Sequence, residues 1–269
     1  MCMSSLKSKI AVVTGASRGA GRGIAYELGR AGATVYVTGR STQESSTDDR
    51  PETIEQTATE VTARGGHGIA VRCDHTDPDD INRLVQQIHD QHGRIDLLVN
   101  SVFGGSEASL PPGQGKRFWE RPPEHWDAMM VAGPKAYLLT TRAAVPLLQQ
   151  SPAALIVNLT SFSPNQAAGN LYYDLAMQSI NRMTCVMGQE LRTSLRLRSV
   201  PVSCGRNGSS TQDSEVMRPR PPLTSDELSS PWHRIRISCN RAVKPYSSRN
   251  SPVTMALRIR TGRNRYCFI

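Results

Sequence analysis

Short apolar segments alternate with longer amphipathic segments along most of the chain. The apolar run that starts at Ile10 stops at Gly15, and continuous runs of this kind are typical of buried parallel strands. The sequence predicts strands over residues 10–14, 34–38, 68–72, 95–99 and 154–158. Between them, apolar residues recur with the period of an α-helix. The sequence predicts these helices over residues 23–31, 53–64, 79–92, 125–150 and 172–192.

This alternation predicts an α/β fold of three layers over residues 1–192. Parallel strands joined by helices need right-handed crossovers, which place helices on both faces of one sheet. We therefore expect a Rossmann-like, doubly wound parallel sheet. The last predicted helix carries Leu175, Ile180, Met183, Met187 and Leu191 mostly on one side.

Residues 193–269 are a different kind of sequence. The strand–helix rhythm stops near Thr193, and no sixth strand can be read after it. This segment carries 14 of the 32 basic residues and 4 of the 23 acidic residues, so its net charge is +10 and that of residues 1–192 is −1. A basic composition rich in Ser, Arg and Pro predicts an irregular or disordered C-terminal tail.

Cysteine usage and the lack of long apolar runs limit the class of protein. None of the six cysteines forms a C-x-x-C pair, which argues against a zinc site and a disulfide framework. The sequence has no run of about 18 apolar residues that could span a bilayer, and its first residues lack the apolar core of a signal peptide. We expect a cytoplasmic protein with reduced thiols, no bound metal and no membrane partner.

A glycine-rich turn, Thr14–Gly21, joins the first strand to the first helix. Glycines allow a tight turn and a close approach of the backbone to a ligand, while the amides that open the helix attract an anion. Such turns also arise for packing alone, but the strand–turn–helix context favours phosphate binding. The predicted phosphate-binding residues are Gly15, Ser17, Arg18, Gly19, Ala20 and Gly21.

Arg40 follows the second strand, at the position where dinucleotide-binding folds select their coenzyme. An acidic residue there binds a free ribose 2′-hydroxyl, whereas guanidinium groups suit a 2′-phosphate. Arg40, together with Arg18 of the glycine turn, therefore predicts NADP(H) in preference to NAD(H). The alternative is that Arg40 is a solvated surface residue.

Residues 5–192 resemble the short-chain dehydrogenase/reductase family. The T-G-x-x-x-G-x-G motif of the family is matched at Thr14, Gly15, Gly19 and Gly21. The resemblance implies a dinucleotide coenzyme and an oxidoreductase activity.

The resemblance also implies roles for residues that follow the third and fourth strands. Asp74 matches the aspartate that holds the adenine in the family. Asn100–Gly104 stands where the family has N-N-A-G, and only the first asparagine is kept. Asn100 is thereby implied to tie the fourth strand to the cofactor region.

The active site that the resemblance implies is partial. Ser161 matches the serine that holds the substrate oxygen, and Tyr173 matches the tyrosine that gives or takes a proton as hydride passes. The lysine of the family, four residues after the tyrosine, binds the nicotinamide ribose and lowers the tyrosine pKa, but here that residue is Met177. A helix asparagine of the family would fall near Gly133 and is also missing. The alternative is that Tyr173 and Met177 form one turn of a packed helix.

The family has further features that cannot be read after residue 192: a sixth strand, a Pro-Gly cofactor turn, a substrate lid and a seventh strand. One hypothesis is that residues 193–269 are translated out of frame. The codons of Val202–Gly208 are degenerate enough that the frame starting at each third base can read Trp-Pro, which many relatives have at that place.

Three functions fit these features. The favoured one is an NADP(H)-dependent oxidoreductase that transfers hydride between the nicotinamide and a carbonyl or secondary-alcohol substrate, with impaired activity. The second is a catalytically inert dinucleotide-binding relative, and the third is a protein whose basic tail binds nucleic acid or an acidic partner without sequence preference. The altered C-terminal segment would weaken a homo-oligomer. Phe118, Trp119 and Trp126 either line a substrate pocket or simply pack.

Overall fold

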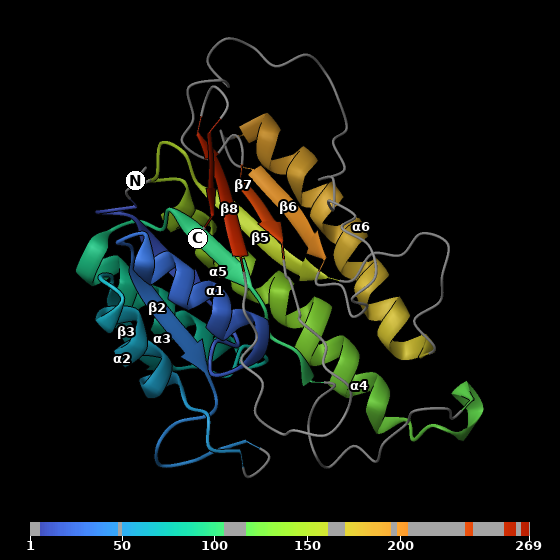
Figure 1. Cartoon of the computed structure of the whole chain (residues 1–269). Helices are drawn as coiled ribbons and strands as arrows, with labels where there is room; N and C mark the ends of the chain where they lie inside the picture. Colours follow the sequence, from blue (N-terminus) through green and yellow to red (C-terminus); the bar gives the residue numbers. More distant parts are fainter. Residues whose placement is uncertain are drawn as a thin grey trace.

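Six parallel strands form the central sheet of the protein. The computed structural model describes residues 6–47, 50–104, 117–160, 170–194, 198–203, 235–238, 256–261 and 265–268. The sheet contains β1 (Ile10–Val13), β2 (Thr34–Gly39), β3 (His67–Arg72), β4 (Leu97–Asn100), β5 (Leu155–Thr160) and β6 (Arg198–Ser203). Its order is β3-β2-β1-β4-β5-β6, so the direction of winding reverses between β1 and β4 (Figure 1). This is the predicted doubly wound topology, in which ligands bind at the carboxyl ends of the strands beside the reversal.

Helices cover both faces of this sheet and give the three expected layers. The helices are α1 (Gly19–Arg30), α2 (Ile54–Ala63), α3 (Pro78–His92), η2 (Phe118–Glu120), α4 (Glu124–Met130), η3 (Val131–Lys135), α5 (Ala136–Leu148) and α6 (Leu171–Ser194). α1 and α2 pack on one face, and α3, α5 and α6 pack on the other (Figure 1). The sequence sets their ends: Thr53 caps α2 by accepting a hydrogen bond from Gln56 N at 3.3 Å, and Gly93, with φ of 66°, ends α3.

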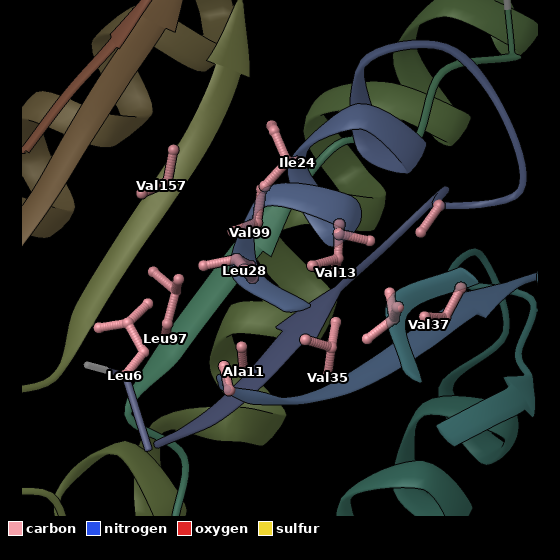
Figure 2. Close-up of a cluster of buried hydrophobic side chains, with 14 of the residues drawn as sticks. Leu6, Ala11, Val13, Ile24, Leu28, Val35, Val37, Leu97, Val99 and Val157 are labelled. Carbon is pink, nitrogen blue, oxygen red and sulfur yellow. The ribbon is translucent and has the colours of Figure 1, made fainter. Parts of the chain in front are cut away.

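The face covered by α1 and α2 contains a continuous apolar core. Ile24 and Leu28 of α1 lie over Val13, Val35 and Val99 of three neighbouring strands (Figure 2). Each of these five side chains is at most 2% exposed. Burial of one such side chain stabilises the fold by about 1.5–3 kcal/mol. This core therefore fixes α1, and with it the glycine turn, on the sheet.

The segment 125–150, predicted to be largely helical, is two helices joined at a kink. The π-helical turn η3 separates α4 from α5. Ala132 and Gly133 leave helical dihedral angles there, and Pro134 follows them. Proline has no N–H to continue the hydrogen-bond ladder of a helix, which explains why the axis breaks at this point.

The prediction that no sixth strand follows residue 193 is wrong. β6 pairs in parallel with β5, from Leu155 opposite Arg198 to Thr160 opposite Ser203. Pro201 weakens the strand pattern in the sequence, because proline is confined to edge strands and bulges, and β6 is the edge of this sheet. The parallel sheet therefore continues past the boundary expected at residue 192.

Leu175 does not lie on the buried side of α6, since it is 39% exposed. Ile180 of the same helix is fully buried. Five residues turn a helix by about 140° beyond one full turn, so the two side chains lie on different faces. Leu175 instead shares its face with Leu171, one turn earlier, which is 43% exposed.

Beyond β6, the structure describes three further strands. They are β7 (Ile235–Ser238), β8 (Ala256–Thr261) and β9 (Arg265–Phe268). They pair antiparallel in the order β7-β8-β9 and form a separate sheet. The rest of the tail after β6 lies outside the described residues.

Candidate active site

The glycine turn brings backbone atoms of β1, α1 and the end of β4 into close contact. Gly15 has φ of 61°, and a Cβ there would lie 2.7 Å from the carbonyl oxygen of Ser101. A Cβ on Gly21 would lie 2.5 Å from the carbonyl oxygen of Gly15. Thr14 Oγ1 accepts a hydrogen bond from Ser101 N at 2.9 Å. The lack of a side chain at these two positions therefore allows the start of α1 to lie directly against the ends of β1 and β4.

Gly19 differs, because the space beside it is open. Its φ is 58°, and a Cβ there would meet no atom within 4 Å. α1 starts at this residue with no side-chain cap hydrogen bond from Arg18 and no acidic residue in its first turn. The positive end of the helix dipole is therefore not neutralised by a carboxylate of the helix itself. Ser17, which is 7% exposed, and Ala20 lie in the same turn, so the six predicted phosphate-binding residues are together.

The Arg18 side chain reaches the carboxyl end of β2. Its Nη2 donates to Ser41 Oγ at 2.7 Å and to Thr47 O at 3.1 Å. Arg40, which follows β2, has Nη1 4.0 Å from Asp74 Oδ2. The two guanidinium groups predicted to select the coenzyme thus lie at the end of the same strand. Sequence reasoning missed Ser41, and its place directly after Arg40 is the signal that could have found it.

Asp74 lies in the turn between β3 and α3, and its side chain is 26% exposed. Its Oδ1 accepts hydrogen bonds from Thr76 N at 2.9 Å and Thr76 Oγ1 at 2.7 Å. Its backbone N donates to Asp80 Oδ2 at 2.8 Å. That backbone hydrogen bond and the guanidinium of Arg83 hold the pKa of Asp80 below its usual range, although burial acts to raise it. A carboxylate that is ionised at neutral pH therefore anchors the turn that carries Asp74.

Asn100 is fully buried and belongs to a polar ladder between the sheet and the helices. Its Nδ2 donates to Thr141 Oγ1 at 3.0 Å and to Asn158 Oδ1 at 2.8 Å. Asn158 Nδ2 in turn donates to Thr184 Oγ1 at 2.8 Å. The ladder joins α5, β4, β5 and α6, so Asn100 positions the end of β4 through its neighbours in the core.

Tyr173 lies in the first turn of α6, which Asn170 caps. Asn170 Oδ1 accepts hydrogen bonds from Tyr172 N at 3.1 Å and Tyr173 N at 3.3 Å. The Tyr173 ring packs edge-on against Phe103, with 5.7 Å between the ring centroids. Because Phe103 follows β4, the structure brings Tyr173 and the glycine turn to the same edge of the sheet.

Met177 lies one turn after Tyr173, at the lysine position of the implied motif, and is 6% exposed. Thr160 Oγ1, at the end of β5, donates to Met177 O at 3.0 Å and lies 3.8 Å from its Sδ. Met177 packs in an apolar cluster that also contains Met129 and Tyr137. The side chain therefore offers no positive charge to the tyrosine. Ser161, the remaining predicted catalytic residue, lies outside the described residues.

The three aromatic residues considered for a substrate pocket are exposed. Phe118 and Trp119 pack edge-to-face with 5.0 Å between their centroids, at 54% and 62% exposure. Trp126, which is 40% exposed, packs against Tyr172 at 5.7 Å. All three therefore contact neighbouring aromatic rings, and Trp126 does so at the start of α6.

Two other kinds of functional feature are absent from the described residues. No group of three or more His, Cys, Asp or Glu side chains among the described residues is arranged to hold a metal ion. Within these ranges, no helix combines the length and the apolar character that crossing a membrane requires. Cys73 and Cys185 are free thiols, and only Cys73 is buried.

Comparison with known proteins identifies relatives of this sequence. The short chain dehydrogenase family model matches residues 9–205. Dehydrogenase/reductase SDR family member 1 of Mus musculus is 35% identical over 188 residues, which cover 70% of this chain and 57% of the mouse protein. The 1-deoxy-11-beta-hydroxypentalenate dehydrogenase of Streptomyces exfoliatus is 32% identical over 200 residues, which cover 74% of this chain and 66% of that protein. The chain thus spans little more than half the length of the mouse relative.

A solved structure agrees with this result. A metagenomic short-chain oxidoreductase in complex with NADP is 30% identical and superposes with a TM-score of 0.64, over 75% of this chain and 84% of that one. The family match includes the glycine turn, Asp74, Asn100 and Tyr173, and it continues through β6. The chain belongs to the short-chain dehydrogenase/reductase family.

Proposed function

We propose that the protein is an NADP(H)-dependent oxidoreductase that transfers hydride between the nicotinamide and a carbonyl or secondary alcohol. The observation that carries this proposal is the pair of guanidinium groups, Arg18 and Arg40, at the end of β2. Arg18 also holds the hydroxyl of Ser41, at 2.7 Å. Guanidinium and hydroxyl donors together suit a ribose 2′-phosphate. The solved relative in complex with NADP supports the same coenzyme.

The glycine turn fits the pyrophosphate of such a coenzyme. The open space beside Gly19 would be filled by any side chain, and the first turn of α1 carries no acidic residue. A phosphate seated there would face backbone amides and the positive end of the helix dipole. Asp74, beside Arg40, offers a partly exposed carboxylate to the amino group of the adenine.

The bound coenzyme would supply the hydride donor or acceptor. Tyr173 is proposed to hold and move the proton of the substrate oxygen through its hydroxyl group, and Ser161 is proposed to bind that oxygen. Phe103 and the apolar cluster that contains Met177 pack around Tyr173. Apolar walls limit water, and a hydrogen bond to the substrate oxygen is stronger where water is excluded.

Met177 is the reason for proposing impaired activity. A cation within about 4–6 Å of a phenol lowers its pKa by about 1–3 units, and each unit changes the phenolate population about tenfold. Met177 supplies no charge, so Tyr173 lacks this assistance from the helix. The same residue favours a second candidate function, a coenzyme-binding protein without catalysis. The cytoplasmic location and the weakened homo-oligomer stay predictions.

Fluorescence titration with NADPH and NADH tests the coenzyme. We expect saturable binding of NADPH that is at least about tenfold tighter than that of NADH, since a hydrogen bond to a charged group is worth about 1.5–3 kcal/mol. Arg40→Asp should reverse the preference, because a carboxylate binds a free 2′-hydroxyl and repels the phosphate. Arg142→Ala, on the exposed side of α5, is the control and should change neither affinity. Equal affinities in the parent would contradict the NADP(H) preference, and no saturable binding would contradict the function.

The role of Met177 is tested by measuring the rate at which the protein reduces a set of carbonyl compounds with NADPH. Met177→Lys is expected to raise the rate by about 10–1,000-fold, in line with the 1–3 units that a neighbouring cation lowers a phenol pKa. Met177→Leu keeps an apolar side chain and should give no gain. No turnover by the parent and by Met177→Lys, with NADPH binding intact in both, would favour the inert relative.

A further inference from the structure

His75 is a buried residue that the proposed reaction does not use. It follows Asp74 in the turn between β3 and α3 and is 2% exposed. Its Nε2 lies 2.8 Å from Thr38 Oγ1 on β2, and its Nδ1 lies 2.9 Å from Thr140 Oγ1 on α5. One ring therefore joins the turn to a strand and to a helix.

Thr38 provides the ground for assigning the direction of these hydrogen bonds. Its Oγ1 can donate its one proton to Val13 O at 3.2 Å, and we assign it as the acceptor from the histidine ring. In this assignment Nε2 of His75 carries the ring proton. Nδ1 is then an acceptor, and Thr140 Oγ1 donates to it. Both ring nitrogens are engaged in the neutral form.

The ring stays neutral over the usual range of pH. Burial lowers the pKa of His75 to about 4, although the carboxylates of Asp74 and Asp80 act to raise it. Cys73 Sγ lies 3.8 Å from Nδ1, and burial raises the pKa of this thiol to about 12, so it faces the ring as an uncharged group. The hydrogen bonds of His75 therefore keep fixed roles at neutral and mildly acidic pH.

The two oxygens of Asp74 have different surroundings. Oδ1 is held inside the turn by both donors of Thr76, at 2.9 Å and 2.7 Å. Oδ2 faces Arg40, whose Nη1 is 4.0 Å away. The turn is anchored on one side by Asp80, through Asp74 N, and on the other by the ring of His75. Thr38, which His75 contacts, lies only two residues before Arg40 on the chain.

We infer that His75 is a positioning residue for recognition of the adenine base. Its ring clamps the Asp74 turn to β2 and α5, so that Asp74 Oδ2 is held where it accepts the exocyclic amino group of adenine. The ring also contacts Thr38 of β2, the strand that leads into Arg40. It thereby fixes the position of Asp74, which would bind the base, relative to Arg40, which would bind the ribose 2′-phosphate. This inference rests on the proposed coenzyme function. It adds to that function a residue that never touches the coenzyme.

Binding of NADPH and of its hypoxanthine analogue, deamino-NADPH, tests the inference by fluorescence titration. The analogue carries a carbonyl oxygen in place of the amino group, so the parent is expected to prefer NADPH by about 10-fold or more. The preference is the ratio of the affinity for NADPH to the affinity for deamino-NADPH. Asp74→Ala should bring this ratio to about 1, and His75→Leu should lower it at least about threefold. The double variant should show no further loss, because both residues act on one hydrogen bond. His75→Asn, which keeps a polar group near Thr140, should recover part of the preference.

Thr140→Val provides the test if His75→Leu fails to fold. It keeps the shape of the side chain, removes the donor to Nδ1, and is expected to lower the preference about two- to threefold. Thr57→Val, another buried threonine but on α2, is the matched control and should lower the melting temperature without changing the preference for NADPH. Lower melting temperatures with an unchanged preference in the His75 and Thr140 variants would overturn the inference. A parent that binds both coenzymes equally would overturn it too, whereas a parent that binds neither would overturn the proposed function itself.

Discussion

Among single residues, Asp96 holds together the amino end of the sheet. Its carboxylate is fully buried. Oδ2 accepts a hydrogen bond from Ile10 N at 3.0 Å, while Oδ1 accepts from Lys9 Nζ at 3.0 Å and Ser151 Oγ at 2.8 Å. Burial by itself raises the pKa of Asp96, but these hydrogen bonds and the charge of Lys9 outweigh it and hold the pKa below its usual range. The ionised form is therefore the one that the fold stabilises.

Replacing this carboxylate should make stability less dependent on pH. Asp96→Asn is expected to lower the free energy of unfolding at neutral pH by about 3 kcal/mol, because it leaves Lys9 without its partner. The folded pKa lies below the unfolded value of about 3.9, so the contribution of Asp96 is complete above that value and disappears as pH falls through the folded pKa. The difference in the free energy of unfolding between the parent and Asp96→Asn should therefore become smaller as the pH falls below about 4.

Urea unfolding across this pH range measures the effect. Asp90→Asn, at a position that is 63% exposed, is the control and should change the free energy of unfolding by less than about 0.5 kcal/mol. If the free energies of unfolding of the parent and Asp96→Asn differed by the same amount at all pH values, the assigned role of the Asp96 charge would be contradicted.

For whole elements, apolar periodicity predicted five strands and the helices beside them, because most of these elements bury a continuous apolar face. β3 is the exception, since its residues are only partly buried or exposed. Segment 125–150 is largely helical as predicted, with a kink at Pro134 that periodicity does not show. Periodicity missed β6, because Pro201 interrupts its strand pattern. The glycine turn was predictable because its motif is local. The hydrogen bond between Arg18 and Ser41 joins residues 23 positions apart in the chain. A local sequence pattern therefore could not predict it.

The polar ladder between β4, β5, α5 and α6 leads to a second stability prediction. Asn158→Leu removes the acceptor of one Asn100 Nδ2 hydrogen and the donor to Thr184 Oγ1. Each buried polar group that loses its partner costs about 1–3 kcal/mol, so we expect a loss of about 2–4 kcal/mol in the free energy of unfolding.

The double variant Asn100→Leu/Asn158→Leu separates this effect from simple loss of packing. Because the two residues share one hydrogen bond, the double variant should lose less stability than the two single variants together. Urea unfolding of the three variants makes the comparison. Additive losses would show that the ladder is not a coupled unit.

Over the whole molecule, the chain consists of a part that matches the short-chain dehydrogenase family, residues 9–205, and a positively charged C-terminal segment. We propose a dinucleotide-binding domain followed by the atypical tail. The sequence predicts the boundary between them at residue 192, but the parallel sheet of the domain extends to β6. The family match ends at residue 205, two residues after β6 ends at Ser203. The excess positive charge belongs to residues 193–269. A change of reading frame close to the end of β6 would account for both observations.

The coding DNA tests this origin directly. We expect a shifted frame across Val202–Gly208 to read Trp-Pro, since relatives have that pair after the corresponding strand. Sequencing of the gene and of the messenger RNA is the measurement. If neither shifted frame encodes Trp-Pro, the tail is a genuine in-frame product and the hypothesis is wrong.

Met177 has a consequence for the evolution of this protein. Methionine has a single codon, ATG, and one base change turns it into AAG, which encodes lysine. The two side chains are unbranched and of similar length, and Thr160 already fixes the backbone of this helical turn. A single point mutation would therefore place an ammonium group on the helix one turn from Tyr173. The lysine of the family motif is thus one mutational step away from the present sequence.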